Sequence, residues 1–176
     1  MLIDDFLPQY DFEEKHSIES DAEPAAIYEA ALDADFSESF IVRALLTLRG
    51  MYADALSIRN LSYSKFRILA EQPAKELLIG LAGKFWTPWG DLQDVNATNF
   101  REFRKDGYAK AAWNFTIDKT SGGSLLQTET RIQCIGESTR RYFGFYWTFV
   151  QPFSGLIRME MLRTIRRRAE LDKLSI

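Results

Sequence analysis

Two neighbouring segments of this chain alternate between apolar and polar side chains, and this constrains the fold more than any other feature. The alternation runs through residues 109–118 and again through residues 124–134, with the turn sequence SGG between them. Period-two alternation is typical of a β-strand with one buried face. The sequence therefore predicts an antiparallel hairpin with one apolar and one polar face. The apolar face is expected to hold Ala111, Trp113, Phe115, Ile117, Leu126, Thr128, Thr130, Ile132 and Cys134.

The opposite face of this hairpin is predicted to lie in water. Its residues are Lys110, Ala112, Asn114, Thr116, Asp118, Gln127, Glu129, Arg131 and Gln133. We expect Lys110, Glu129 and Arg131 to form a surface ladder of cross-strand pairs, each contributing about 0.2–1 kcal/mol. The alternative is that these charged groups reach a ligand cavity, but it would turn Trp113 and Phe115 outward.

Shorter elements surround the hairpin. Residues 13–20 alternate as a strand, and residues 20–35 read as a helix with Pro24 in its first turn and Ser20 or Asp21 as the cap. A second helix is predicted over residues 37–50, capped by Ser37. Two strands, 65–71 and 75–86, flank a turn at residues 72–73, and residues 87–91 form a loop. A short helix at 97–103 is expected to be capped near Asn96 or Thr98.

The last part of the chain predicts a long helix, capped by Ser138, that covers the apolar face of the sheet. Its segment YFGFYWTFVQPF, residues 142–153, contains seven aromatic side chains. The charge-free apolar window, residues 142–157, is shorter than the roughly 20 residues of a membrane-spanning helix. At helical spacing one apolar stripe comprises Tyr142, Tyr146, Phe149, Phe153, Leu156 and Ile157.

A second stripe comprises Met161, Leu162, Ile165 and Ala169, and it is rotated from the first stripe by more than a quarter turn. A straight helix cannot direct both stripes to one sheet. Pro152 lies near the change, and proline removes a helical hydrogen bond. The sequence therefore predicts a kink or break between Gln151 and Leu156.

The segments HSIESDAEPAAIYEAAL and TETRIQCIGESTRRYFGFYWTFVQPFSGLIRMEMLRTI resemble the first and last parts of the SRPBCC superfamily, which includes START, Bet v 1-like and polyketide cyclase-like proteins. ELLIGLAGKFW and GYAKAAWNFTID are similar to middle strands of a bacterial branch of that superfamily. The resemblance implies one α+β helix-grip domain over residues 1–176. In this fold a curved antiparallel sheet wraps around a long C-terminal helix, and two short helices follow the first strand. Members bind lipids, sterols, polyketides or hormones, some are cyclases or aromatases, and others are co-chaperones.

By this resemblance we expect a binding or carrier module for a hydrophobic small molecule, lipid-like or polyketide-like, in an apolar cavity between sheet and helix. Small strand residues, namely Gly80, Ala82, Gly83, Ala111 and Ala112, are expected to leave room for it. The expected ligand-binding residues are Phe85, Trp113, Phe115, Thr128, Thr130, Tyr142, Tyr146, Phe149 and Phe153. Two alternatives are a cyclase- or aromatase-type enzyme and a protein-interaction module with a filled core.

Catalytic motifs are scarce, so an enzyme is the less expected reading and no catalytic residue is proposed from the sequence. His16 and Cys134 are the only histidine and cysteine, and no metal-ligand spacing or cofactor motif is present. His16 is expected to be structural or solvated, and Cys134 to be a small core residue. No metal or cofactor is therefore expected.

Charge and the N-terminal sequence set the remaining expectations. The net charge of −3 gives no general attraction to nucleic acid, and the acidic start of the chain does not resemble a signal peptide, which predicts a cytoplasmic protein. Residues 1–38 are acidic, whereas residues 158–168 carry five arginines. These two ends are expected to attract one another or to be solvated. The alternative for the arginines is weak contact with an anionic membrane surface or with nucleic acid.

Overall fold

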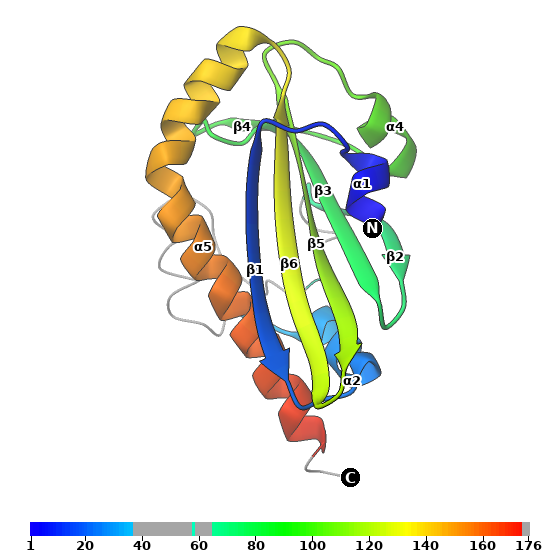
Figure 1. Ribbon diagram of the computed structural model, residues 1–176. Helices are drawn as coiled ribbons and strands as arrows, with labels where there is room; N and C mark the ends of the chain where they lie inside the picture. Colours follow the sequence, from blue (N-terminus) through cyan, green and yellow to red (C-terminus); the bar gives the residue numbers. More distant parts are fainter. Residues whose placement is uncertain (37–57, 59–64, 174–176) are drawn as a thin grey trace.

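The computed structural model describes residues 1–36, 58 and 65–173, which form an α+β structure around one antiparallel sheet (Figure 1). The helices in this part of the chain are α1 (Leu2–Phe6), α2 (Pro24–Asp33), α4 (Ala97–Glu102) and α5 (Glu137–Lys173). The strands are β1 (Phe12–Ser20), β2 (Arg67–Gln72), β3 (Glu76–Lys84), β4 (Gly90–Gln93), β5 (Ala109–Thr120) and β6 (Gly123–Cys134).

The predicted hairpin is at the centre of the sheet. Its strands β5 and β6 pair along their whole length, from Ala109 opposite Cys134 to Thr120 opposite Gly123. The strand order is β1-β6-β5-β3-β2, and β4 pairs with β3. The first and last strands are therefore neighbours, and α5, which follows β6, lies alongside them (Figure 1). An antiparallel sheet with a long C-terminal helix held along one face is the helix-grip fold that the resemblance implied.

Most of the predicted short elements are confirmed. Pro24 begins α2, and Asn96 caps α4 by accepting hydrogen bonds from two backbone N–H groups at 2.9 and 3.0 Å. A turn joins β2 and β3 as predicted, although it comprises residues 73–75 rather than 72–73. Several boundaries differ from the prediction, three of them in ways that matter for the elements concerned. The N-cap of α2 is Glu23 rather than Ser20 or Asp21. Helix α5 begins before Ser138. Strand β4 begins within the predicted 87–91 loop. The helix predicted over residues 37–50 lies outside the described residues.

The apolar face of the hairpin packs as predicted, and we call it the inner face of the sheet. Trp113, Phe115 and Ile117 belong to a core cluster with residues of α2 and α5. Ala111 and Ile132 belong to a second cluster with Phe143 and Trp147 of α5. The Trp113 side chain is only 7% exposed. The two-residue alternation therefore identified correctly which side chains face the helix.

The prediction that the other face lies in water is wrong. Strands β3, β5 and β6 are buried on both faces over most of their lengths, because α1 and α4 cover the outer face (Figure 1). Apolar side chains of these two helices, including Ile3, Phe6 and Phe100, pack on Leu78, Ala82 and Ala112 there. The sheet is thus the middle one of three layers.

The charged groups expected on the surface are buried beneath α1 and α4. Arg131 donates to Glu129 at 2.5 Å, to Asp4 of α1 at 2.8 Å and to the Leu7 carbonyl at 3.2 Å. Lys110 donates to two carbonyl groups of α4, at 3.2 Å each. Burial of polar groups is tolerated when they are paired in this way. The predicted surface ladder is therefore an internal network that attaches α1 and α4 to the sheet.

The predicted break in the last helix is also wrong, because α5 is continuous from Glu137 to Lys173 with Pro152 inside it. The reason is that the first stripe was assigned to the wrong side of the helix. The buried side chains are Thr139, Phe143, Trp147, Ile157, Leu162, Ile165 and Ala169. At 3.6 residues per turn these positions fall on one side. Both halves of α5 therefore face the sheet within one unbroken helix, which curves along its length (Figure 1).

The opposite side of α5 carries large apolar side chains that are exposed. They are Tyr142, Phe145, Phe149, Phe153 and Leu156, with exposed fractions from 46% to 74%. Three of the small strand residues, Gly80, Ala82 and Ala112, were likewise assigned a role that the structure contradicts, whereas Ala111 does face α5. Gly80 and Ala112 lie on the outer face, where Leu69 and Phe100 occupy the space beside Gly80, so they leave no room near α5. No described helix is long and apolar enough to cross a membrane.

Candidate functional site

Three polar side chains form a row across the inner face of the sheet. Glu14 of β1 is the register partner of Thr130 of β6, and Thr130 is in turn the partner of Trp113 of β5. Register partners in an antiparallel sheet point to the same side. We call these three residues the inner row. The row exists because β1 returns to pair with the last strand, which brings residue 14 beside residue 130.

Each member of the inner row has a buried polar atom without a hydrogen-bond partner. The atoms are Glu14 Oε2, Thr130 Oγ1 and Trp113 Nε1, and none has a partner among the residues that the structure describes. The three side chains are only 7%, 6% and 7% exposed. An unsatisfied buried polar group costs about 1–3 kcal/mol, and most native groups avoid this cost. On this face of the sheet, these three atoms on adjacent strands are buried polar groups that the described residues leave unsatisfied.

His16 and Thr128 lie one step along the same face from the inner row, and both are satisfied. His16 Nε2 is 3.1 Å from Glu14 Oε1, so the imidazole donates to one carboxylate oxygen when its proton is on Nε2. Thr128 Oγ1 donates to the Asn114 carbonyl at 2.6 Å. The His16 side chain is 23% exposed, and the Glu14 end of the inner row is therefore close to solvent.

Helix α5 covers both ends of the inner row. A Cβ atom at Gly155 would lie 2.9 Å from Glu14 Oε1 and 3.3 Å from the His16 ring, so glycine lets the helix approach this pair. At the other end, the Arg158 guanidinium lies 4.8 Å from the centre of the Trp113 ring. The Phe66 ring meets the Trp113 ring edge-on at 5.2 Å. The polar row is thus set among apolar and aromatic groups, with a carboxylate at one end and a guanidinium at the other.

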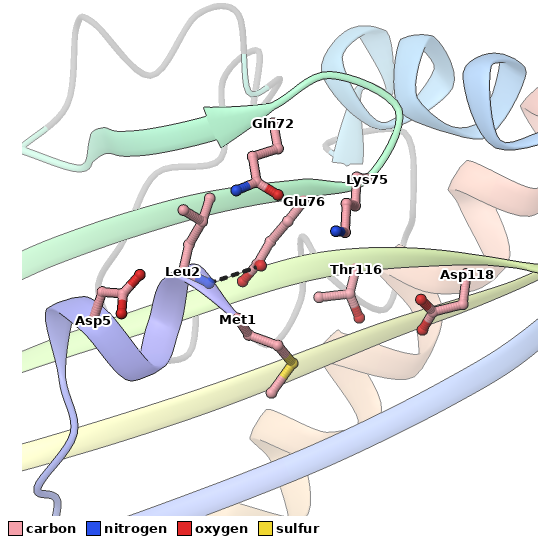
Figure 2. A pocket seen from close by; sticks show the side chains of 8 residues that line it. All are labelled: Met1, Leu2, Asp5, Gln72, Lys75, Glu76, Thr116 and Asp118. Carbon is pink, nitrogen blue, oxygen red and sulfur yellow. Dashed lines mark hydrogen bonds between the residues drawn. The ribbon is translucent and has the colours of Figure 1, made fainter.

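A separate pocket of about 290 Å³ lies on the outer face, between α1, the β2–β3 hairpin and β5 (Figure 2). Its lining is mostly polar and comprises Met1, Leu2, Asp5, Gln72, Lys75, Glu76, Thr116 and Asp118. Glu76 is its most buried charged residue, but this carboxylate already accepts from the Leu2 and Ile3 N–H groups at 2.8 and 3.4 Å and from Asn114 at 2.8 Å. Glu76 therefore holds α1 to the sheet, and the pocket does not suit an apolar ligand.

The structure gathers only some of the ligand-binding residues predicted from the sequence. Trp113, Phe115, Thr128 and Thr130 share the inner face and are buried. Phe85 and Tyr146 are partly buried against Phe143, near the start of α5. Tyr142, Phe149 and Phe153 are exposed on the far side of α5. These last three lie outside the site, for the same reason that the stripe was misassigned.

Sequence reasoning missed Glu14 and His16, which the alternation of β1 could have identified. Phe12, Glu14, His16 and Ile18 occupy one face of that strand, and Phe12 packs on Phe143 of α5. A carboxylate and an imidazole between two apolar residues on a core-facing strand are unusual, because such groups are rarely buried without a role. The pattern was visible in the sequence, because the apolar Phe12 and Ile18 mark this face of β1 as the one that faces the core.

Cys134 is distant in register from His16 and does not form a nucleophile pair with it. Cys134 pairs with Ala109 at one end of the hairpin, whereas Thr128, the partner of His16, lies six residues further back along β6. Burial and the nearby Asp11 carboxylate raise the pKa of the Cys134 thiol to about 12. The thiol is therefore protonated near neutral pH and is a poor nucleophile.

The sequence matches no protein-family model and no curated protein. The chain is similar to several solved structures. One is protein MLL2253 from Mesorhizobium loti, with 14% identity, a TM-score of 0.42, and coverage of 89% of this chain and 98% of that chain. Another is the di-domain ARO/CYC BexL from the BE-7585A biosynthetic pathway, with 12% identity, a TM-score of 0.45, and coverage of 90% of this chain and 50% of that chain.

A third is an AHSA1-like protein from Rhizobium etli, with 11% identity, a TM-score of 0.36, and coverage of 88% of this chain and 82% of that chain. At these identities and TM-scores the likeness assigns neither a ligand nor a reaction to this chain. What the chain does has to be argued from its own residues.

Proposed function

We propose that the protein binds a small, largely apolar molecule between the inner face of the sheet and α5. The inner row carries this proposal. Its three buried polar atoms lack partners among the described residues, while the side chains around them are apolar or aromatic. Sites for small molecules commonly combine an apolar lining with a few convergent polar groups that orient the ligand. The inner row has this composition.

The energetic argument favours a ligand over a filled core. An ordinary core would place valine and phenylalanine at positions such as Thr130 and Trp113, because these residues avoid the cost of an unpaired hydroxyl or indole N–H. A bound molecule with its own polar group would satisfy these atoms and recover that cost. The interaction-module alternative has no comparable reason to keep three unsatisfied groups in one row.

A second candidate is an enzyme that transfers a proton, and the Glu14–His16 pair favours it. A buried carboxylate 3.1 Å from an imidazole, next to a hydroxyl group, is an arrangement that general acid–base catalysis uses. The molecule retained by a Glu14→Gln variant distinguishes the two functions. An enzyme would leave its substrate in the variant and its product in the wild type, whereas a binding protein would hold the same molecule in both.

Native mass spectrometry followed by denaturing extraction tests the proposed binding. Protein purified without detergent should carry a noncovalent apolar molecule, and this adduct should be lost or reduced in Trp113→Ala. Phe149→Ala is the matched control, because it removes an exposed ring from the other side of α5 and should keep the adduct. Wild-type protein that carries no adduct, and binds no added apolar probe at micromolar concentration, would overturn the proposal.

A further inference from the structure

The chemistry of the inner row differs from one end to the other, and this difference constrains what the ligand can be. At the β1 end the available atom is Glu14 Oε2, which belongs to a carboxylate and can only accept a hydrogen bond. At the β5 end it is Trp113 Nε1, which can only donate. The Thr130 hydroxyl between them can do either. A complementary ligand must therefore present a donor to Glu14.

We infer that the site selects an apolar amine, with its ammonium group on Glu14, over an apolar carboxylic acid of the same length. The inference rests on the proposed binding function and names the class of ligand for that site. A charged donor stabilises a buried carboxylate more than a neutral donor does, because an ammonium group adds a charge–charge attraction to the hydrogen bond that an alcohol makes alone. An alcohol would bind less tightly, and a carboxylate would be repelled by Glu14.

The charged groups around the row support this orientation. His16 satisfies Glu14 Oε1 at 3.1 Å and leaves Oε2 without a partner among the described residues. Arg158 lies at the opposite end, over the Trp113 ring and 3.7 Å from the Met161 sulfur. A cation is thus attracted to the β1 end and disfavoured at the β5 end. The more exposed His16 side chain, at 23%, also puts the Glu14 end nearer the solvent from which an ammonium group enters.

Three probes of equal chain length test the inference: decylamine, decanol and decanoic acid. Near neutral pH the amine is a cation and the acid an anion. Isothermal titration of delipidated wild-type protein should give the affinity order amine, alcohol, acid, with about ten-fold tighter binding of the amine than of the alcohol. The Glu14→Gln variant should bind the amine about ten-fold more weakly than the wild type does, so that the amine no longer binds more tightly than the alcohol.

Glu19→Gln is the matched control, because it removes the same charge from an exposed position on the same strand, and it should keep the wild-type order. If none of the three probes binds, the proposed function itself fails. If the probes bind with equal affinity, or if the acid binds most tightly because Arg158 governs the site, this inference is overturned and the proposed function stands. The order of the three affinities for the wild-type protein tests the inference even if the Glu14→Gln variant does not fold.

Discussion

Thr128 and Thr130 lie two positions apart on the inner face of β6, yet their hydroxyl groups are in opposite situations. Thr128 donates to the Asn114 carbonyl at 2.6 Å, whereas the buried Thr130 hydroxyl has no partner among the described residues. Both side chains are almost fully buried. The sequence predicted the face on which these residues lie, but hydroxyl pairing depends on a local backbone geometry that no alternation pattern contains.

Replacing each threonine with valine should therefore have effects of opposite sign. Thr128→Val loses a hydrogen bond and should lower the free energy of unfolding by about 1 kcal/mol. Thr130→Val removes an unsatisfied hydroxyl and should raise the free energy of unfolding of the ligand-free protein by about 1 kcal/mol, while weakening ligand binding. Urea denaturation of the two variants measures both values. Equal destabilisation by the two changes would contradict the proposed role of the inner row.

Lys110 provides a second prediction at the residue scale, and it concerns pH. Burial, followed by the nearby charge of Arg104, lowers the Lys110 pKa from 10.5 to about 8. Between these two values the unfolded state binds more protons than the folded state, so stability from this group rises with pH. Between about pH 7 and pH 10 this group should raise the free energy of unfolding by on the order of 2 kcal/mol.

The Lys110→Met variant should lose this rise in stability. Denaturant titrations at both pH values measure it as a difference between wild type and variant. Lys119→Met, at the exposed end of the same strand, is the control and should keep the wild-type pH dependence. A Lys110→Met protein with the same pH dependence as wild type would mean that Lys110 is not held in a buried, charged state.

Among the elements, α5 shows most clearly what sequence patterns can and cannot determine. The existence of a long final helix followed from the apolar periodicity, and the structure confirms it. Its orientation did not follow, because the rings of the segment from Tyr142 to Phe153 cover more than half of the helix circumference and so define no unique amphipathic stripe. Extending the stripe of Leu162 and Ile165 backwards at helical spacing would have led to Trp147 and Phe143, which are buried.

Alanine substitutions on the two sides of α5 test this orientation. Phe143 is 1% exposed and contacts the rings of Phe12, Phe85, Trp86 and Trp147. Phe143→Ala should lower the free energy of unfolding by about 3–5 kcal/mol. Phe149 is 61% exposed, and Phe149→Ala should change it by less than about 1 kcal/mol. Comparable losses for the two variants in thermal and urea denaturation would show that the helix faces the sheet differently.

The two glycines of α5 give a second test at this scale. A Cβ atom at Gly144 would make an ordinary contact with Phe12 at 3.4 Å, so Gly144→Ala should stabilise the protein by up to about 1 kcal/mol through helix propensity. At Gly155 the same atom would lie 2.9 Å from Glu14 Oε1 and would displace the carboxylate. Gly155→Ala should therefore weaken ligand binding and give no such stabilisation. Equal stabilisation without loss of binding would remove Gly155 from the site.

On the scale of the whole molecule, the main departure from the sequence-based prediction is the third layer. Polar alternation on β5 and β6 normally indicates a solvated face. Here α1 and α4 cover that face, and they are attached through Arg131, Glu76 and Lys110. Alternation reports which side chains share a face, but it does not report what lies above that face. Trp113 and Thr130 of the inner row were among the predicted ligand-binding residues, but Glu14 was missed for a related reason, because only the topology brings β1 beside β6.

The central claim is that an apolar ligand binds between the inner face and α5, in contact with Trp113. Fluorine NMR of protein labelled with 5-fluorotryptophan tests it directly, since the chain has four tryptophans that Trp→Phe variants can assign. Adding decanol should shift the Trp113 resonance in a saturable way and leave Trp89, which is 91% exposed, unchanged. The absence of a shift in every tryptophan resonance, or a shift of the Trp89 resonance alone, would contradict the account.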